Sequence, residues 1–265
     1  MLRNSRWLVL LGLVGIGLAA GLAGSQPAAE PARTPRTPAE REKLVKPGKF
    51  GENGAADGRR GFFDSWNQQI IREDTPVSTV FMGDSITELW DLQVYFQSLP
   101  GEVIENRGIG GDLAAIMAKR FEADVLQLRP RNVVILGGIN DLNYLTVKHT
   151  DPEKIFDQTV GGLEAMIHQA QKAGINVLVC SILPTNTKFH NHAALAALRA
   201  KVNERVKELC RENKCVYVDY EAALRDKDGR LRAELSEDGV HVQWAGYEIM
   251  ARVLKEAAKA NGLRL

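Results

Sequence analysis

The sequence predicts an α/β fold in which helices cover both faces of a parallel β-sheet. Two observations support this class. Five short segments are continuous apolar runs, which is typical of strands that are buried on both faces. Segments with helical spacing of apolar residues lie between them, so that strands and helices alternate along the chain. The three-layer α/β/α sandwich follows from this alternation.

Three of the expected strands are followed directly by glycine-containing motifs. We expect strands over residues 77–82, 103–106, 132–136, 175–183 and 216–218. Glycine-marked motifs follow the first three of these, at residues 83–85, 108–112 and 137–141. Parallel sheets of this kind carry their functional sites at the carboxyl ends of the strands. Three motifs at one sheet edge therefore indicate a site.

The helices are predicted from periodicity and end signals. The first amphipathic helix contains Phe62, Phe63, Trp66, Ile70 and Ile71 at helical spacing. The next covers residues 113–128, and another covers 152–173, with Pro152 at its start and Gly174 just past its end. Further helices are expected over residues 193–213 and 245–260, and the last ends at Asn261 and Gly262.

The first fifty residues are expected to lie outside the folded domain. A basic start is followed by an uncharged apolar run over residues 7–24, so we expect residues 1–24 to be a signal peptide. The run is also long enough to be a retained membrane anchor. Residues 25–50 are rich in Ala, Pro, Arg, Glu and Lys, which predicts a disordered linker. The folded domain is expected over residues 51–265. The protein would thus be exported, either periplasmic or secreted, or else anchored in a membrane by its N-terminus.

Composition excludes some classes of function. The formal net charge is +1 and the charges are mixed along the chain, so no nucleic-acid surface is indicated. The three cysteines show no zinc-binding spacing, and no metal site is expected. Cys210 and Cys215 flank a junction between a helix and a strand, where an oxidising compartment would allow a disulfide.

Ser85 is the candidate nucleophile. It follows Gly83 and Asp84 directly after an apolar strand, on a turn that would present its hydroxyl to solvent. A serine hydroxyl is a weak nucleophile unless a base accepts its proton. The same three residues also fit a turn that simply caps the next helix.

His241 is the candidate base. It lies three residues after Asp238 in a glycine-containing turn before the last helix. An aspartate so placed can hold the imidazole through Nδ1 while Nε2 accepts the serine proton. The alternative is a helix-capping aspartate beside a surface histidine.

Gly111 and Asn140 are candidates for an oxyanion hole. A glycine lets a backbone N–H approach closely, and the Asn140 amide can donate to a developing negative charge. An ordinary Asn-Asp turn after a strand would look the same. The run from Gly108 to Asp112 also resembles part of a dinucleotide-binding loop, but Leu113 stands where that motif needs a glycine.

Taken together, the blocks Gly83-Asp84-Ser85, Gly111, Gly138-x-Asn140-Asp141 and Asp238-x-x-His241 resemble the SGNH (GDSL) hydrolase family. The segment from Asn106 to Asp112 is similar to the platelet-activating-factor acetylhydrolase-like branch. The resemblance implies a flavodoxin-like fold with five parallel strands and no cofactor. It implies that Ser85, Asp238 and His241 are catalytic and that Ser85, Gly111 and Asn140 form the oxyanion hole.

We therefore expect a serine ester hydrolase that acts through an acyl-serine intermediate. Because no long apolar insertion could serve as a lid, the acyl group should be short, most simply acetyl, on a carbohydrate or small ester. Trp90, Leu89 and the Leu183-Pro184 pair could line the pocket or belong to the core. The alternatives are an O-acyltransferase that uses the same serine, a lipase or lysophospholipase, and a non-catalytic carbohydrate-binding relative.

Overall fold

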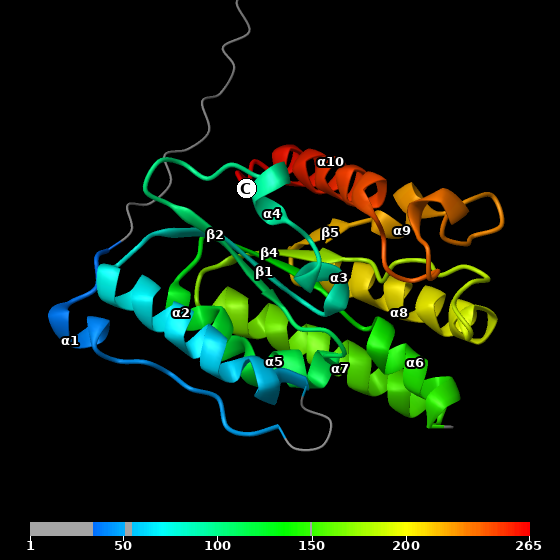
Figure 1. Ribbon diagram of the computed structural model, residues 1–265, viewed down its shortest axis with the longest axis horizontal. Helices are drawn as coiled ribbons and strands as arrows, with labels where there is room; N and C mark the ends of the chain where they lie inside the picture. Colours follow the sequence, from blue (N-terminus) through cyan, green and yellow to red (C-terminus); the bar gives the residue numbers. More distant parts are fainter. Residues whose placement is uncertain (1–33, 51–54, 149) are drawn as a thin grey trace, which may run out of the picture. The chain divides into compact units, whose positions relative to one another are not determined.

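The computed structural model describes residues 34–50, 55–148 and 150–265, and these ranges hold one parallel sheet. The strand order is β2-β1-β3-β4-β5, and every pair of neighbours is parallel. The strands are β1 Val77–Gly83, β2 Val103–Gly108, β3 Asn132–Leu136, β4 Asn176–Cys180 and β5 Val216–Val218 (Figure 1). The predicted strands and their order along the chain are confirmed, although β4 ends at Cys180 rather than at Leu183.

Helices cover both faces of this sheet, as predicted. In Figure 1 helix α10 lies above the sheet, while α2, α5 and α7 lie below it. The α-helices are α1 Pro38–Arg41, α2 Arg60–Glu73, α3 Ser85–Glu88, α4 Leu92–Tyr95, α5 Ala114–Asp124, α6 Ile139–Val147, α7 Pro152–Lys172, α8 His192–Glu212, α9 Tyr220–Leu224 and α10 Trp244–Ala260. Single turns of 3₁₀-helix are η2 Ala55–Arg59, η3 Leu126–Leu128 and η4 Ala233–Leu235.

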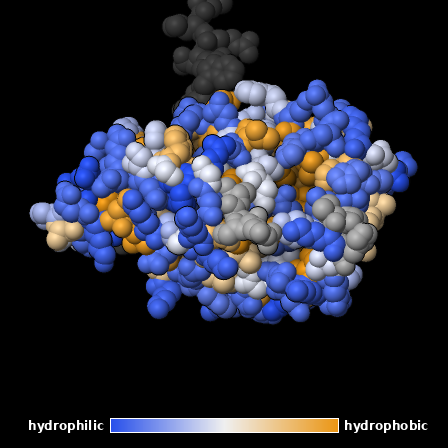
Figure 2. Space-filling model, turned by 60° about the horizontal axis from the view of Figure 1, so that its bottom comes forward, coloured by the Kyte–Doolittle hydropathy of each residue, from blue (hydrophilic) through white to orange (hydrophobic). Residues whose placement is uncertain are grey.

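Burial on both faces explains why the strands read as continuous apolar runs. Every residue of β1 and of β3 is buried, including the small polar Ser78 and Thr79. A two-layer fold would expose alternate residues of these strands to water. The face turned forward in Figure 2 is largely hydrophilic, with hydrophobic residues in small separate patches. The apolar sides of the helices thus pack against the sheet.

Local signals set the helix ends. Asp151 accepts a hydrogen bond from the Glu153 N–H at 3.0 Å, and Pro152 begins α7. Gly174 follows this helix with a φ of 72°, a left-handed conformation that favours glycine. The helix expected over residues 113–128 is divided, because α5 ends at Asp124 and the chain continues as the 3₁₀ turn η3.

The start of the folded part differs from the expected boundary at Gly51. The structure places residues 34–265 in one compact unit. The side chain of Arg36 is buried, and it pairs with Asp74 at 3.0 Å and donates to the Gln127 carbonyl oxygen at 2.7 Å. Residues 34–50 of the expected linker therefore contact the domain through ion pairs and hydrogen bonds, which a charge-rich composition does not reveal. The expected signal or anchor segment, residues 1–24, lies outside the described residues, as do residues 25–33.

No membrane-spanning helix occurs within the described ranges, since none of their helices is both long and apolar enough to cross a bilayer.

Candidate active site

The carboxyl ends of β1, β2 and β3 meet at one edge of the sheet. Gly83 at the end of β1 is paired with Gly108 of β2 and with Leu136 of β3. The chain segments that carry Ser85, Gly111 and Asn140 follow directly from these three strand ends. The sequence predicts that the three motifs lie at one edge of the sheet, and the register of the strands brings them to that edge.

Ser85 is the first residue of helix α3, immediately after β1. Asp84 caps this helix, because its Oδ1 accepts a hydrogen bond from the Ile86 N–H at 3.0 Å. Gly83 is required by space, since an added Cβ would lie 2.1 Å from the Thr87 Oγ1 and 2.6 Å from the Leu136 carbonyl oxygen. The turn is therefore tight, and it holds Ser85 half-buried at the rim of the sheet.

The structure joins Ser85, His241 and Asp238 in one hydrogen-bonded chain. The Ser85 Oγ lies 2.9 Å from the His241 Nε2. The His241 Nδ1 lies 2.6 Å from the Asp238 Oδ2. The side chains of His241 and Asp238 are 36% and 52% exposed, so water reaches the outer end of this chain.

Asp238 also builds the turn that presents His241. Its Oδ1 accepts hydrogen bonds from the backbone N–H groups of Val240 at 3.0 Å and His241 at 2.8 Å. Partial burial raises the pKa of Asp238, but the hydrogen bond from the His241 ring and these two N–H groups outweigh it and hold that pKa well below its usual range. Asp238 is therefore an anion at neutral pH. An anion at Nδ1 favours the tautomer that leaves Nε2 free to accept the serine proton.

Gly111 and Asn140 lie on adjoining segments of the same rim. Gly111 has a φ of 81°, in the left-handed region that favours glycine. A Cβ added to the neighbouring Gly110 would lie 3.6 Å from the Ser85 Cβ, so this loop passes beside the serine. Asn140, the second residue of α6, donates from Nδ2 to the Asp112 carbonyl oxygen at 3.1 Å. All of the predicted site residues thus come to one edge of the sheet.

Glu88 is a site residue that the sequence analysis did not identify. Its Oε2 accepts a hydrogen bond from the Gly110 N–H at 2.6 Å, and its Oε1 pairs with the guanidinium of Arg59. Glu88 therefore fixes the glycine loop from the same short helix that begins with Ser85. The available signal was its spacing, because residues three apart share a helix face.

Buried carboxyl groups lie directly behind the site. Burial raises the pKa of Asp84 to about 7, although a hydrogen bond from the Ile86 N–H opposes the shift. Burial also raises the pKa of Asp141 to about 7, while its oxygens accept from the Ala114 N–H. These two carboxyl groups accept hydrogen bonds from N–H groups at the starts of helices. The Ser85 hydroxyl bonds to His241 and not to either of them.

Three of the possible pocket residues, Trp90, Leu183 and Pro184, are buried instead. Trp90 is 2% exposed and packs against Phe81 and Tyr247, and Leu183 is 1% exposed. Leu89, in contrast, is 60% exposed. Sequence spacing could not distinguish these outcomes, because Trp90 and Leu89 are adjacent and point in opposite directions.

The cysteines and the residue types that can bind metals form no further site in the described ranges. Cys180, Cys210 and Cys215 are free thiols in the structure, so the disulfide that an oxidising compartment would allow is absent from it. Over the described ranges no group of three or more histidine, cysteine, aspartate or glutamate side chains is placed to hold a metal ion.

Comparison with known proteins gives relatives of one kind. An acetylxylan esterase from Geobacillus stearothermophilus is 26% identical over 168 residues, which cover 61% of this chain and 74% of that protein. A GDSL-like lipase from Bacteroides thetaiotaomicron is 27% identical, with a TM-score of 0.61 over 76% of this chain and 97% of that one.

Two further solved structures share the fold. A platelet activating factor protein from Streptococcus pneumonia is 24% identical, with a TM-score of 0.64 over 77% of this chain and 94% of that one. The solved acetylxylan esterase from Geobacillus stearothermophilus, a catalytic mutant at a serine, is 22% identical with a TM-score of 0.58 over 71% of this chain and 96% of that one.

The model of the GDSL-like lipase/acylhydrolase family matches residues 81–249, a range that runs from β1 through the site and into α10. This range contains all of the candidate site residues. The five-stranded parallel sheet with flanking helices is the SGNH hydrolase fold. The chain belongs to the GDSL-like lipase/acylhydrolase family and is a carboxylic ester hydrolase.

Proposed function

We propose that this protein is a serine esterase that removes acetyl groups from a carbohydrate. The observation that carries the proposal is the chain from the Ser85 Oγ through the His241 ring to the Asp238 carboxylate, with distances of 2.9 and 2.6 Å. These three groups supply a nucleophile, a base and an anion that orients the base.

The reaction has two halves. As the Ser85 Oγ bonds to the ester carbonyl carbon, its proton passes to the His241 Nε2. The tetrahedral intermediate then collapses, the bond to the sugar oxygen breaks, and His241 returns the proton to that oxygen. A water molecule next gives a proton to His241 and attacks the acyl-serine, and collapse releases acetate and restores the Ser85 hydroxyl.

Three donors would stabilise the negative oxygen of the intermediate. They are the N–H groups of Ser85 and Gly111 and the side-chain amide of Asn140. An amide nitrogen carries two protons, and one of those on Asn140 already bonds to the Asp112 carbonyl oxygen. The second proton is thus available in a side chain whose orientation is fixed. Such preorganised donors act where charge develops in the transition state.

The substrate class is supported by the relative and by the exposure of the site. The acetylxylan esterase that matches this chain acts on an acetylated polysaccharide, as its name states. Exposed fractions of 36% for His241 and 52% for Asp238 show that water can reach the base. This favours hydrolysis over acyl transfer to a sugar, because transfer requires that water be kept away from the acyl-enzyme.

A panel of esters tests the proposed substrate. We expect hydrolysis of p-nitrophenyl acetate and release of acetate from acetylated xylo-oligosaccharides, with little turnover of p-nitrophenyl palmitate. Equal or faster turnover of the palmitate would contradict the short-chain proposal. Appearance of a new acetylated sugar when an unesterified acceptor is added would instead identify a transferase.

We also propose that residues 1–24 direct export of the enzyme, which suits an esterase that acts on polysaccharide outside the cell. N-terminal sequencing of the mature protein tests this, because cleavage near residue 24 is expected. Recovery of the intact N-terminus in a membrane fraction would support the anchor, and recovery of the intact chain from the cytoplasm would contradict export.

A further inference from the structure

Helix α10 begins next to the candidate active site. Its first residue, Trp244, follows His241 by three positions. One turn later the Tyr247 hydroxyl donates a hydrogen bond to the Ile86 carbonyl oxygen at 2.8 Å, and its ring stacks on Trp90 with a centroid distance of 5.4 Å. The start of α10 is therefore fixed against the short helix that carries Ser85.

Trp244 presents its side chain to solvent at this point. Its exposed fraction is 63%, and its ring centroid lies 5.5 Å from that of Tyr95 at an interplanar angle of 46°. The Tyr95 hydroxyl donates to the Trp244 carbonyl oxygen at 3.4 Å, and Val94 beside it is 50% exposed. Removal of the large apolar surface of an indole from water is favourable in free energy. An exposed indole at the start of α10, three positions after His241, is therefore available to a ligand.

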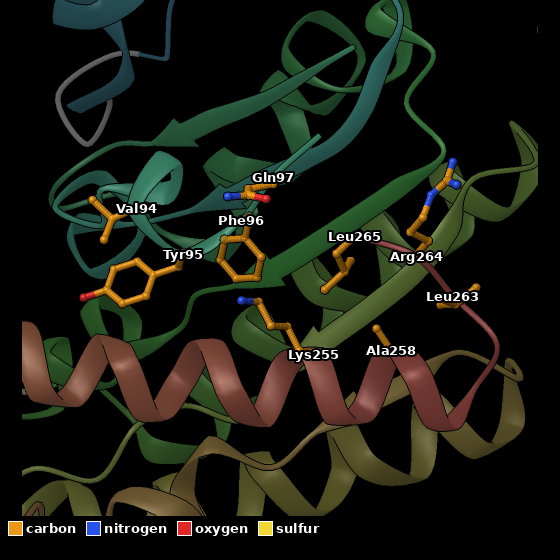
Figure 3. Close-up of a pocket in the computed structure, with 9 residues that line it drawn as sticks. All are labelled: Val94, Tyr95, Phe96, Gln97, Lys255, Ala258, Leu263, Arg264 and Leu265. Carbon is orange, nitrogen blue, oxygen red and sulfur yellow. The ribbon is translucent and has the colours of Figure 1, made fainter. Parts of the chain in front are cut away.

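These side chains begin a groove that runs along α10, which we call the α10 groove. Its first part has a volume of about 540 Å³, with Val94 and Tyr95 of α4 on one side and side chains of α10 on the other, among them Trp244, Glu248 and Arg252. The second part, of about 570 Å³, shares Val94, Tyr95 and Lys255 with the first and reaches Leu265. Figure 3 shows Val94, Tyr95 and Phe96 on one side of this second part, with Lys255 and Ala258 of α10 on the other.

We propose that the α10 groove binds the sugar chain that carries the ester, with Trp244 and Tyr95 as the platform nearest the active site. This inference rests on the proposed carbohydrate esterase function. The apolar face of a sugar ring packs on an aromatic ring, and its hydroxyl groups bond to carboxylates and guanidinium groups such as Glu248 and Arg252. Helix α10 has 17 residues and is about 25 Å long, so the groove can hold several sugar units.

The chemistry of the groove argues for a carbohydrate rather than a fatty acyl chain. A long acyl chain is best held in an enclosed apolar channel, because burial of its methylene groups drives its binding. The α10 groove is open along its length, and charged side chains of α10 line it at Glu248, Arg252, Lys255 and Glu256. A polymer rich in hydroxyl groups satisfies these charges, whereas a hydrocarbon would desolvate them.

Steady-state kinetics of Trp244→Ala on two substrates tests this inference. We expect KM for acetylated xylo-oligosaccharides to rise about tenfold, as for loss of one aromatic anchor. The relative loss on p-nitrophenyl acetate should be much smaller, because that ester lacks sugar units. Trp244→Phe should restore part of the binding. Trp66→Ala is the matched control, because Trp66 is also exposed, at 47%, but lies on α2 and not on the α10 groove.

The outcomes separate this inference from the proposed function. If wild-type enzyme deacetylates the oligosaccharide and Trp244→Ala does so with unchanged KM, the α10 groove proposal is wrong while the proposed function stands. An equal loss on both substrates would also overturn it, because the effect would then lie at the catalytic centre. If wild-type enzyme releases no acetate from any acetylated sugar but cleaves p-nitrophenyl acetate, the carbohydrate function itself fails. A rise of KM that grows with oligosaccharide length supports the groove.

Discussion

The His241 Nε2 lies 2.9 Å from the Ser85 Oγ, although the two residues are 156 positions apart in the chain. Two elements produce this approach. The tight turn after β1 presents Ser85, and the Asp238 turn before α10 presents His241. The Tyr247 hydroxyl then ties α10 to the Ile86 carbonyl oxygen, next to the nucleophile. The pair is thus held by the fold on both sides.

The substitution Asp238→Asn should damage catalysis far more than folding. The asparagine oxygen can still accept the backbone N–H groups of Val240 and His241, so the turn should survive. The amide cannot stabilise the imidazolium, and it favours the wrong tautomer. We expect kcat to fall by a factor of about 10³–10⁴. Steady-state assays on p-nitrophenyl acetate measure the loss of kcat. A melting temperature within a few degrees of that of the wild type is the control for folding. A fall of less than tenfold would contradict the role of Asp238.

The substitution Asn140→Ala should lower kcat with little effect on KM. Its amide would act on the charge that develops in the transition state, and loss of one such donor typically costs about 10²–10³ in rate. The hydrogen bond to the Asp112 carbonyl oxygen is lost as well, at a cost of about 1 kcal/mol in unfolding free energy. Kinetics and urea unfolding measure the two effects. A rise in KM at constant kcat would place Asn140 in ground-state binding instead.

Glu88 should act as a positioning residue for the glycine loop. Glu88→Ala removes the acceptor for the Gly110 N–H and the partner of Arg59. The loop is then free to move, and we expect kcat to fall about tenfold or more, because small displacements of a catalytic group are costly. Glu88→Gln retains an acceptor oxygen and should recover much of the rate. Comparison of kcat and KM for the two variants is the test, and equal losses in both would show that the charge, not the hydrogen bond, matters.

Stability should fall between about pH 4 and pH 7. Asp84 and Asp141 have pKa values of about 7 in the folded protein because of burial. In the unfolded chain the two groups release their protons near pH 4, whereas in the folded protein they keep them until the pH approaches 7. Their protonated forms therefore stabilise the folded state fully below about pH 4. Each contribution is lost as the pH rises toward 7, by up to about 1.4 kcal/mol per pH unit.

Urea unfolding across this pH range checks the effect. Asp84→Asn is neutral at every pH and keeps an oxygen for the Ile86 N–H, so its stability should depend less steeply on pH than that of wild type. The exposed Asp228 offers the control, since Asp228→Asn should leave the slope as it is. An equally steep profile in Asp84→Asn would show that Asp84 is already ionised in the folded state.

The sequence could predict the sheet because burial on both faces leaves a direct mark, a continuous apolar run such as β3. It could not predict α3, α4 and α9, whose four or five residues are too few to show a period. Helix α6 was missed because Gly138 and Asn140 indicate a turn, although Gly138 with a φ of 116° in fact begins a helix.

The same distinction holds at the site. The identities and order of Ser85, Asp238 and His241 are a property of the sequence, and so is their place after strands or before a helix. The roles of Glu88 and Arg59 depend on contacts across the fold, at Gly110 and at the start of α2. The spacing of Glu88 three residues after Ser85 indicates its place beside the nucleophile only once α3 is known to be a helix. The contacts of Arg36 with the domain belong to the same class.

The most direct test of the central claim is labelling with a fluorophosphonate, followed by mass mapping of the labelled peptide. The probe reacts with a serine only when a base removes its proton. We predict one label, on Ser85, that is absent in Ser85→Ala and strongly slowed in His241→Ala, with loss of hydrolysis in both variants. A label on another residue, or full hydrolysis by Ser85→Ala, would contradict the account.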